Sequence, residues 1–138
     1  MFVRGVTLLE LLVVLVVVGV IGALALPAYR QHLVRVNRTE ATTTLYEVAN
    51  AEERYYLRYG RYARDIAAAP PDGLGITVAT RHYGFSVALA DDSQSFIASA
   101  TPARGGGQEA DGECLVFSLD HRGRRAVSGT RETSFCWR

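Results

Sequence analysis

The sequence predicts an α+β fold, in which one long N-terminal helix packs on a small antiparallel sheet of about four strands. Two observations lead to this prediction. Up to Gly60 the apolar side chains recur at helical spacing, and beyond it short alternating runs are separated by turn residues. The chain has 138 residues, 49% hydrophobic and 21% charged, which leaves room for one modest domain.

The first half of the predicted helix is apolar enough to cross a membrane. Leu11 to Leu26 contains no charge. As a helix, Val6 to Pro27 would cover roughly 33 Å, close to the ~30 Å hydrocarbon core of a bilayer. The alternative is a cleaved secretory signal, for which Ala23 to Ala25 offers a weak cleavage match. Glu10 argues against a signal peptide, because the apolar core of a signal peptide has no use for a carboxylate. If Glu10 is buried in the membrane it needs a cation as partner, and otherwise it must stay hydrated at the membrane interface.

Helical spacing continues beyond Pro27 to about Leu57, and Gly60 marks the turn onto the domain. The predicted packed face consists of apolar residues three or four positions apart: Leu33, Val36, Ala41, Leu45, Val48, Tyr55 and Tyr59. Charged residues are expected on the other faces: Arg35, Arg38, Glu40, Glu47 and Arg54.

A turn-rich connection, Asp65 to Gly75, leads from helix to sheet. The alternating runs predict four strands, at Tyr83 to Leu89, Ser95 to Ala100, Leu115 to Leu119 and Arg125 to Val127. The turns between them are expected at Asp91 to Gln94 and Asp120 to Gly123, with Gly105 to Gly107 as a flexible loop. Four short strands alone bury too little apolar surface, so one face of the sheet should pack on the second half of the helix.

The two cysteines, Cys114 and Cys136, bear on the compartment. An even count late in a small domain is typical of one structural disulfide in an oxidising environment, and two unpaired buried thiols are the alternative. A bridge would close a 23-residue loop and stabilise the fold by roughly 3 to 3.5 kcal/mol. The arginines alone indicate instead that the part of the chain after the apolar segment lies in the cytoplasm, where disulfides are rare. Arg4 precedes the apolar segment, whereas three arginines follow it closely: Arg30, Arg35 and Arg38.

The N-terminal residues resemble those of type IV pilins. The segment Gly5 to Leu11 reads GVTLLEL and is followed by a valine-rich run, Gly19 and the sequence LPAY from Leu26. The resemblance implies that a prepilin peptidase cuts between Gly5 and Val6 and methylates Val6. It also implies that Glu10 pairs with the N-terminal amine of a neighbouring subunit. Val6 departs from the phenylalanine usual in the family, which bears on peptidase efficiency.

The resemblance also implies the pilin fold, a domain division and a location. Residues 1–5 would be the leader, 6–27 the membrane or fibre-core half of the helix, and 28–138 an extracytoplasmic domain. That domain would comprise helix to about 57, a loop at about 60–80, and the sheet and disulfide region at about 81–138. The precursor would lie in the bacterial inner membrane, contacting lipid, the peptidase and the assembly platform, and then join other pilin subunits in a surface fibre.

Gly19, Gly22 and Pro27 are poor residues for a helix interior, Pro27 costing about 3 kcal/mol. In related fibres the corresponding stretch loses helical order on assembly. A kinked membrane helix is the other interpretation, since membrane helices tolerate proline when the freed carbonyl finds a partner.

The C-terminal stretch resembles the disulfide-bounded region of pilins, and its Cys136-Trp137 ending resembles PilE-type minor pilins in particular. Five arginines oppose three carboxylates from Glu113 onward, a net charge of +2. One hypothesis is a DNA-contacting patch at Arg122, Arg124 and Arg125. The alternative hypothesis is a solvated loop surface, which the small net charge of +2 favours. The formal net charge of +1 for the whole chain also gives no reason to expect nucleic acid as the main partner.

We expect neither an enzyme nor a metal or cofactor site. The three histidines, His32, His82 and His121, fall in different predicted elements and show no ligand spacing. Asp111 and Glu113 alone supply fewer oxygen ligands than calcium needs.

The predicted function is a structural subunit of a type IV pilus, most simply a minor pilin, for motility, adhesion or DNA uptake. A major pilin, a pseudopilin of a type II secretion system and a non-polymerising membrane-anchored module are the alternatives.

Overall fold

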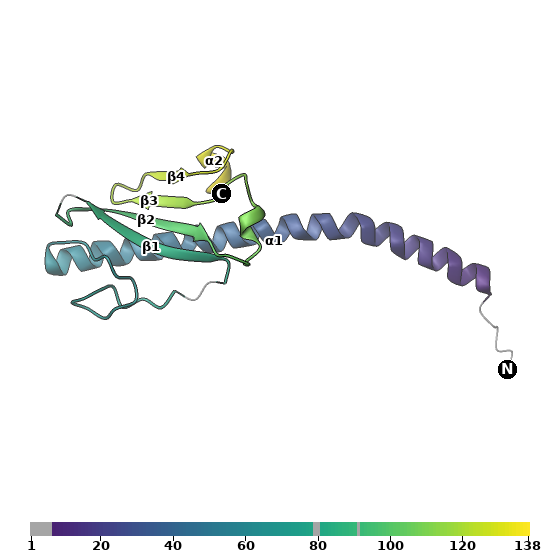
Figure 1. Ribbon diagram of the computed structural model, residues 1–138, viewed down its shortest axis with the longest axis horizontal. Helices are drawn as coiled ribbons and strands as arrows, with labels where there is room; N and C mark the ends of the chain where they lie inside the picture. The colour runs from purple at the N-terminus through teal and green to yellow at the C-terminus, as the bar shows by residue number, and fades with distance from the viewer. Residues whose placement is uncertain (1–6, 79–80, 91) are drawn as a thin grey trace. The chain divides into compact units, whose positions relative to one another are not determined.

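The computed structural model describes residues 7–78, 81–90 and 92–138. Figure 1 shows the order of its elements: α1 (Leu8–Tyr59), β1 (Tyr83–Ala90), β2 (Ser95–Pro102), the 3₁₀ turn η1 (Gln108–Ala110), β3 (Phe117–Asp120), β4 (Arg125–Val127) and α2 (Thr133–Cys136). The chain divides into two compact units, residues 1–35 and 36–138, which are described separately.

The first unit is the N-terminal part of α1. An 18-residue window of this helix has a mean hydropathy of 2.9 and no buried residue, so it is long and apolar enough to cross a membrane. Gly19, Gly22 and Pro27 all lie inside α1, and none of them ends the helix.

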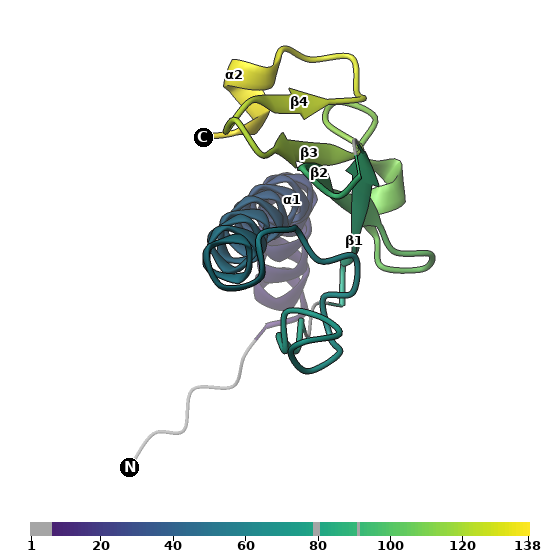
Figure 2. The same cartoon turned by 90° about the vertical axis from the view of Figure 1, so that its left-hand side faces the viewer.

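The second unit is a four-stranded antiparallel sheet, in the order β1-β2-β3-β4, packed on the remainder of α1 (Figure 2). Its register follows the hairpins that the sequence predicts, with Phe85 opposite Ala100 and Ala98 opposite Leu119. Alternate residues of β2 and β3 face inward, where Phe96, Phe117 and Leu119 are almost completely buried. Ile97, on the other face of β2, is half exposed.

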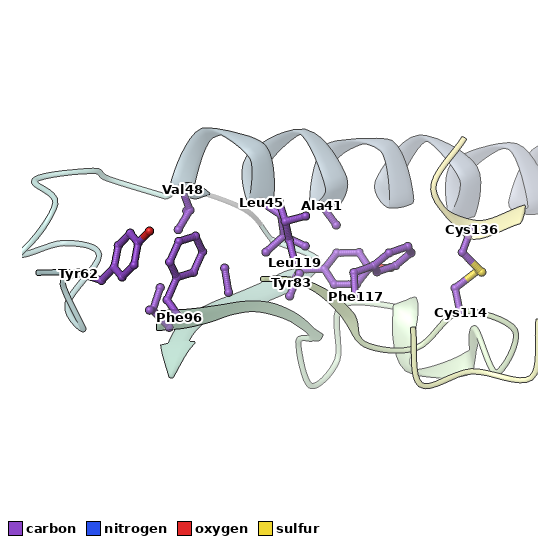
Figure 3. Packing of buried hydrophobic residues seen from close by; sticks show 13 residues of the cluster. Ala41, Leu45, Val48, Tyr62, Tyr83, Phe96, Cys114, Phe117, Leu119 and Cys136 are labelled. Atoms are coloured by element: carbon purple, nitrogen blue, oxygen red, sulfur yellow. A yellow bond between two sulfur atoms is a disulfide. The ribbon is translucent and has the colours of Figure 1, made fainter. Parts of the chain in front are cut away.

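The core lies between this sheet face and one stripe of α1 (Figure 3). Ala41, Leu45 and Val48 supply the stripe at steps of four and three residues, and each is fully buried. Tyr55, from the same predicted series, is also buried, whereas Leu33 and Val36 remain 41% and 48% exposed. The predicted packed face is therefore confirmed from Ala41 to Tyr55, whereas Tyr59, at the end of the helix, is half-buried.

Several element boundaries differ from the prediction, and two short helices were not predicted. The helix ends at Tyr59, two residues later than expected, because Gly60 (φ 69°) takes the left-handed conformation and its N–H closes on the Tyr56 carbonyl at 2.8 Å. The third strand begins at Phe117, because Leu115 has a φ of 50° and cannot continue an extended strand. The short helices η1 and α2 were not predicted, since three or four residues show no periodicity.

Candidate nucleic-acid interface and assembly residues

Two of the predicted processing residues, Gly5 and Val6, lie outside the described residues. Glu10 lies in the first turn of α1 and is exposed. The Glu10 backbone N–H donates to Thr7 Oγ1 at 3.2 Å, so Thr7 caps the first turn of the helix. A carboxylate three residues after such a cap also suits the positive end of the helix dipole. The sequence Thr7 to Glu10 thus has a local role in starting the helix.

Of the residues predicted to soften the helix, Gly19 and Gly22 have open space around them. A methyl group added to Gly19 or Gly22 would meet no atom within 4 Å. Neither glycine is therefore required by a close approach inside the described chain.

The predicted disulfide is present, joining Cys114 to Cys136 with a Cα–Cα distance of 5.8 Å. Both cysteines are buried, and the last turn of the chain, α2, carries Cys136 onto the core. Gly129 is needed in the segment that leads there, because any side chain at this position would collide with the carbonyl of Glu113. Trp137 follows the bridge and packs edge-on against Phe117, with ring centroids 5.9 Å apart.

Arg38 is a buried ion-pair centre and not, as its place on the helix predicts, a solvent-facing residue. It is 7% exposed, and its guanidinium donates to both carboxylate oxygens of Asp111, at 2.7 and 2.6 Å. A further hydrogen bond reaches Glu113 at 2.9 Å, which also accepts from Arg131 at 3.2 Å. The hydrogen bonds to Asp111, opposed by burial, raise the pKa of Arg38. Arg38 and Arg131 lower the pKa of Glu113.

This cluster also contains the two carboxylates considered above for a calcium loop. Asp111 and Glu113, the two carboxylates that such a loop would use, are both engaged by the Arg38 guanidinium. The described residues contain no group of three or more potential metal ligands. His82 lies beside the Gly106 carbonyl, at 2.7 Å from Nδ1, and His121 lies in the β3–β4 turn.

Hydrogen bonds hold three loops in place at one end of the sheet, the end where β1 turns into β2 (Figure 1). The Tyr62 N–H donates to the Ser93 carbonyl at 2.9 Å, and Gln94 Nε2 donates to the Gly60 carbonyl at 3.1 Å. The His121 N–H donates to the Phe96 carbonyl at 3.1 Å. The end of α1, the β1–β2 turn and the β3–β4 turn are therefore fixed beside one another.

These segments carry four exposed arginines, which we call the loop-end surface: Arg58, Arg61, Arg122 and Arg124. Arg124 is paired with Asp120 at 2.6 Å. Burial raises the pKa of Asp120, but hydrogen bonds from Arg124 and Arg122 outweigh it, and the pKa is lowered. Within the described chain no carboxylate lies within ion-pair distance of the other three arginines.

The three arginines of the predicted DNA patch do not form one group. Arg122 and Arg124 belong to the loop-end surface, whereas Arg125 stacks over the rings of Tyr46 and Trp137, 5.6 and 5.7 Å from their centroids. The aromatic pair thus holds Arg125 by cation–π contacts. Sequence reasoning also missed Arg58 and Arg61, whose only signal is their place on either side of the helix-ending Gly60.

The fold, the buried disulfide and the apolar N-terminal helix define a type IV pilin. Residues 27–118, more than half of the chain, match the family described as type IV minor pilin ComP, DNA uptake sequence receptor. The chain belongs to this family, and it is a minor pilin, a structural subunit of type IV pili. Such pilins assemble with other pilin subunits, and the apolar helix fits a membrane-anchored precursor.

Individual relatives agree with this assignment. The chain is 29% identical over 135 residues to the fimbrial protein EcpC of Eikenella corrodens, covering 97% of this chain and 80% of that protein. A type IV pilin from Shewanella oneidensis has a similar structure, with a TM-score of 0.53 and 28% identity over 76% of this chain and 98% of that one. The non-core minor pilin PilV of Neisseria meningitidis gives a TM-score of 0.54 and 26% identity over 73% and 92% of the two chains.

Proposed function

We propose that this minor pilin binds double-stranded DNA for uptake, through the loop-end surface. The observation that carries the proposal is the set of guanidinium groups at that end that pair with no carboxylate of the described chain, Arg58, Arg61 and Arg122. Arginine binds phosphate through two parallel N–H bonds, and an exposed guanidinium that no carboxylate engages keeps N–H groups for this purpose, even where, as in Arg122, Nε donates to a neighbouring histidine at 3.3 Å.

The family description supports DNA as the partner, since it names a DNA uptake sequence receptor. The matched residues include Arg58 and Arg61 but end at Ser118, before Arg122 and Arg124. The α1 end of the surface therefore has the stronger support. The net charge of the C-terminal stretch alone favours a solvated surface, but the fold adds arginines from a distant segment, so composition understates the local charge.

The test is the salt dependence of DNA binding by the full chain in detergent micelles. Fluorescence anisotropy with a labelled mixed-sequence duplex would compare the wild type with an Arg61→Ala, Arg122→Ala double variant. We expect weaker binding and a plot of log K against log salt whose slope is smaller by about 2, because each substitution removes one arginine–phosphate interaction.

The matched control is the Arg81→Ala, Arg104→Ala double variant. It removes the same charge from exposed residues at the other end of the β1–β2 hairpin. Equal losses in the two double variants would show a general charge effect, and no salt-dependent binding by the wild type would end the proposal.

We further propose that prepilin peptidase cuts after Gly5 and methylates Val6, that the assembly platform of the inner membrane receives the protein, and that residues 28–138 face the periplasm. The Gly5 to Glu10 motif and the apolar helix support this sequence of events. Mass spectrometry of sheared fibres should find a peptide that begins with methylated Val6, at low stoichiometry. An intact leader on the native protein would contradict it. The role of the chain is then structural and recognitional, without an enzymatic step.

A further inference from the structure

Glu52 is the one fully buried carboxylate in the described part of the chain that lacks a cationic partner. It lies on α1 and is 0% exposed. Its Oε2 accepts the Ala63 N–H at 2.9 Å, whereas Oε1 has no hydrogen-bond partner among the described residues. Buried polar atoms are almost always paired, so a carboxylate with one unpaired oxygen requires an explanation.

The surroundings of Glu52 disfavour its charge. The neighbouring Glu53 on the same helix contributes a like charge. From the segment that follows the helix comes Tyr62, whose hydroxyl donates to Glu53 at 3.1 Å and whose pKa is raised to about 12, so it stays neutral. From the sheet, Phe96 packs on Tyr62 with ring centroids 4.8 Å apart. No described arginine forms an ion pair with Glu52.

The bond from Ala63 closes the chain reversal that follows α1. Gly60 ends the helix, Arg61 comes next, and Tyr62 and Ala63 are held by backbone N–H bonds to Ser93 and to Glu52. Arg61, an arginine of the loop-end surface, therefore sits between the helix end and the Glu52 hydrogen bond. Breaking that bond would remove one of the hydrogen bonds that hold the segment presenting Arg61.

We propose that Glu52 is a proton-controlled latch: its neutral form holds the Gly60 to Ala63 reversal closed, and release of its proton to water lets the reversal open. An ionised Glu52 can regain hydration only by leaving its buried place, and opening the reversal exposes it. The latch itself stands on Glu52 and Ala63 alone. Its effect on DNA affinity rests on the proposed function, because Arg61 lies in the same segment.

The direction of the effect follows from burial. Burial raises the pKa of Glu52 from an ordinary 4.5 to about 7, although the Ala63 N–H bond lowers it in part. The open segment has the ordinary value. The open population should therefore grow up to about tenfold per pH unit between 4.5 and 7, and level off above 7.

Hydrogen exchange of the Ala63 amide in the full chain, measured by NMR in detergent micelles from about pH 4.5 to about pH 9, tests the latch. After correction for the intrinsic rate, the Ala63 protection factor should fall by roughly a hundredfold or more up to pH 7 and then stay constant. The Leu74 amide is the internal control, because its acceptor at 2.9 Å is the Asp65 backbone carbonyl, which does not titrate.

Two variants make the result specific. Glu52→Gln keeps the shape and an oxygen acceptor, and should give a protection factor for Ala63 that is independent of pH. Glu53→Gln should keep most of the wild-type fall, since burial, and not the neighbouring charge, is the main cause of the raised pKa of Glu52. A flat profile in the wild type, or the same fall in Glu52→Gln, would overturn the latch.

DNA affinity provides a separate readout. If the latch presents Arg61, wild-type affinity for the duplex should change more between pH 5 and pH 8 than that of Glu52→Gln. A pH-dependent Ala63 profile without any DNA binding would refute the proposed function and leave the latch intact. DNA binding together with a pH-independent Ala63 protection factor would refute the latch and leave the proposed function intact.

Discussion

Replacing Arg38 by leucine should be among the most destabilising single changes in this domain. The substitution removes the guanidinium and leaves the Asp111 carboxylate, whose side chain is only 2% exposed, without either of its hydrogen bonds. Breaking a buried ion pair on one side costs about 3 to 5 kcal/mol, because the remaining charge is buried unpaired. A domain of this size is typically stable by about 5 to 15 kcal/mol, so the variant should approach the limit of folding.

The assay is urea unfolding of the full chain in detergent micelles, followed by tryptophan fluorescence. Trp137 is the only tryptophan of the chain and packs against Phe117 in the core and Tyr46 on the helix, so it reports on the domain and not on the apolar segment. The free energy of unfolding should fall by the amount above without a large change in the slope against urea.

Arg124→Leu is the matched control. It breaks an ion pair of the same length, 2.6 Å, but the Arg124 side chain is 73% exposed. Such surface pairs contribute about 0 to 1 kcal/mol. A second comparison is Arg38→Met combined with Asp111→Leu, which removes both charges and should recover much of the stability lost in Arg38→Leu. If Arg38→Leu costs no more than Arg124→Leu, the reasoning from burial is refuted.

Three further changes test other parts of the molecule. Changing Cys114 and Cys136 together to serine should lower the free energy of unfolding by about 3 kcal/mol in the same urea assay, and an unchanged value would refute a stabilising bridge. Glu52→Gln should be more stable than the wild type by up to about 3 kcal/mol at pH 8, but equal to it near pH 4.5. The sign follows because a raised pKa in the folded state means stability that is lost as pH rises to about 7. Glu10→Val should leave insertion and processing intact but reduce the amount of the protein in sheared fibres, and normal incorporation would assign the carboxylate another role.

The fold could be predicted from the sequence because its main elements have strong local signals. The α1 stripe of Ala41, Leu45 and Val48 repeats with the helical period, and a residue of left-handed conformation, Gly60, ends the helix. The β1–β2 hairpin shows alternation on both sides of a polar turn. To predict the disulfide, it was enough to know that the chain has two cysteines and that both lie late in a small domain.

The buried polar contacts could not be predicted, because their partners lie far apart in the sequence. Arg38 and Asp111 are separated by 73 positions, and an arginine beside apolar residues of a helix ordinarily points to solvent. Glu52 is part of a run of charged residues, EER, in which nothing distinguishes the buried carboxylate from the exposed Glu53. The loop-end surface could not be predicted for the same reason, since only the topology of the sheet brings the segments that carry Arg61 and Arg122 to the same end.

The two buried charges of α1 suggest how one helix serves different ends of the domain. Arg38 is neutralised by two carboxylates from the segment that leads to Cys114, and its ion pairs hold that segment to the helix. Among the described residues, Glu52 is hydrogen-bonded to a single backbone amide and to no cation, so the stability of that hydrogen bond depends on a proton. A saturated ion pair gains little from opening, because each charge already has its partner, whereas an ionised acid with one unpaired oxygen gains hydration when it opens. The disulfide end should therefore stay rigid over the pH range in which the arginine-bearing end becomes mobile, and the contrast between the two ends is what the Ala63 exchange profile would measure.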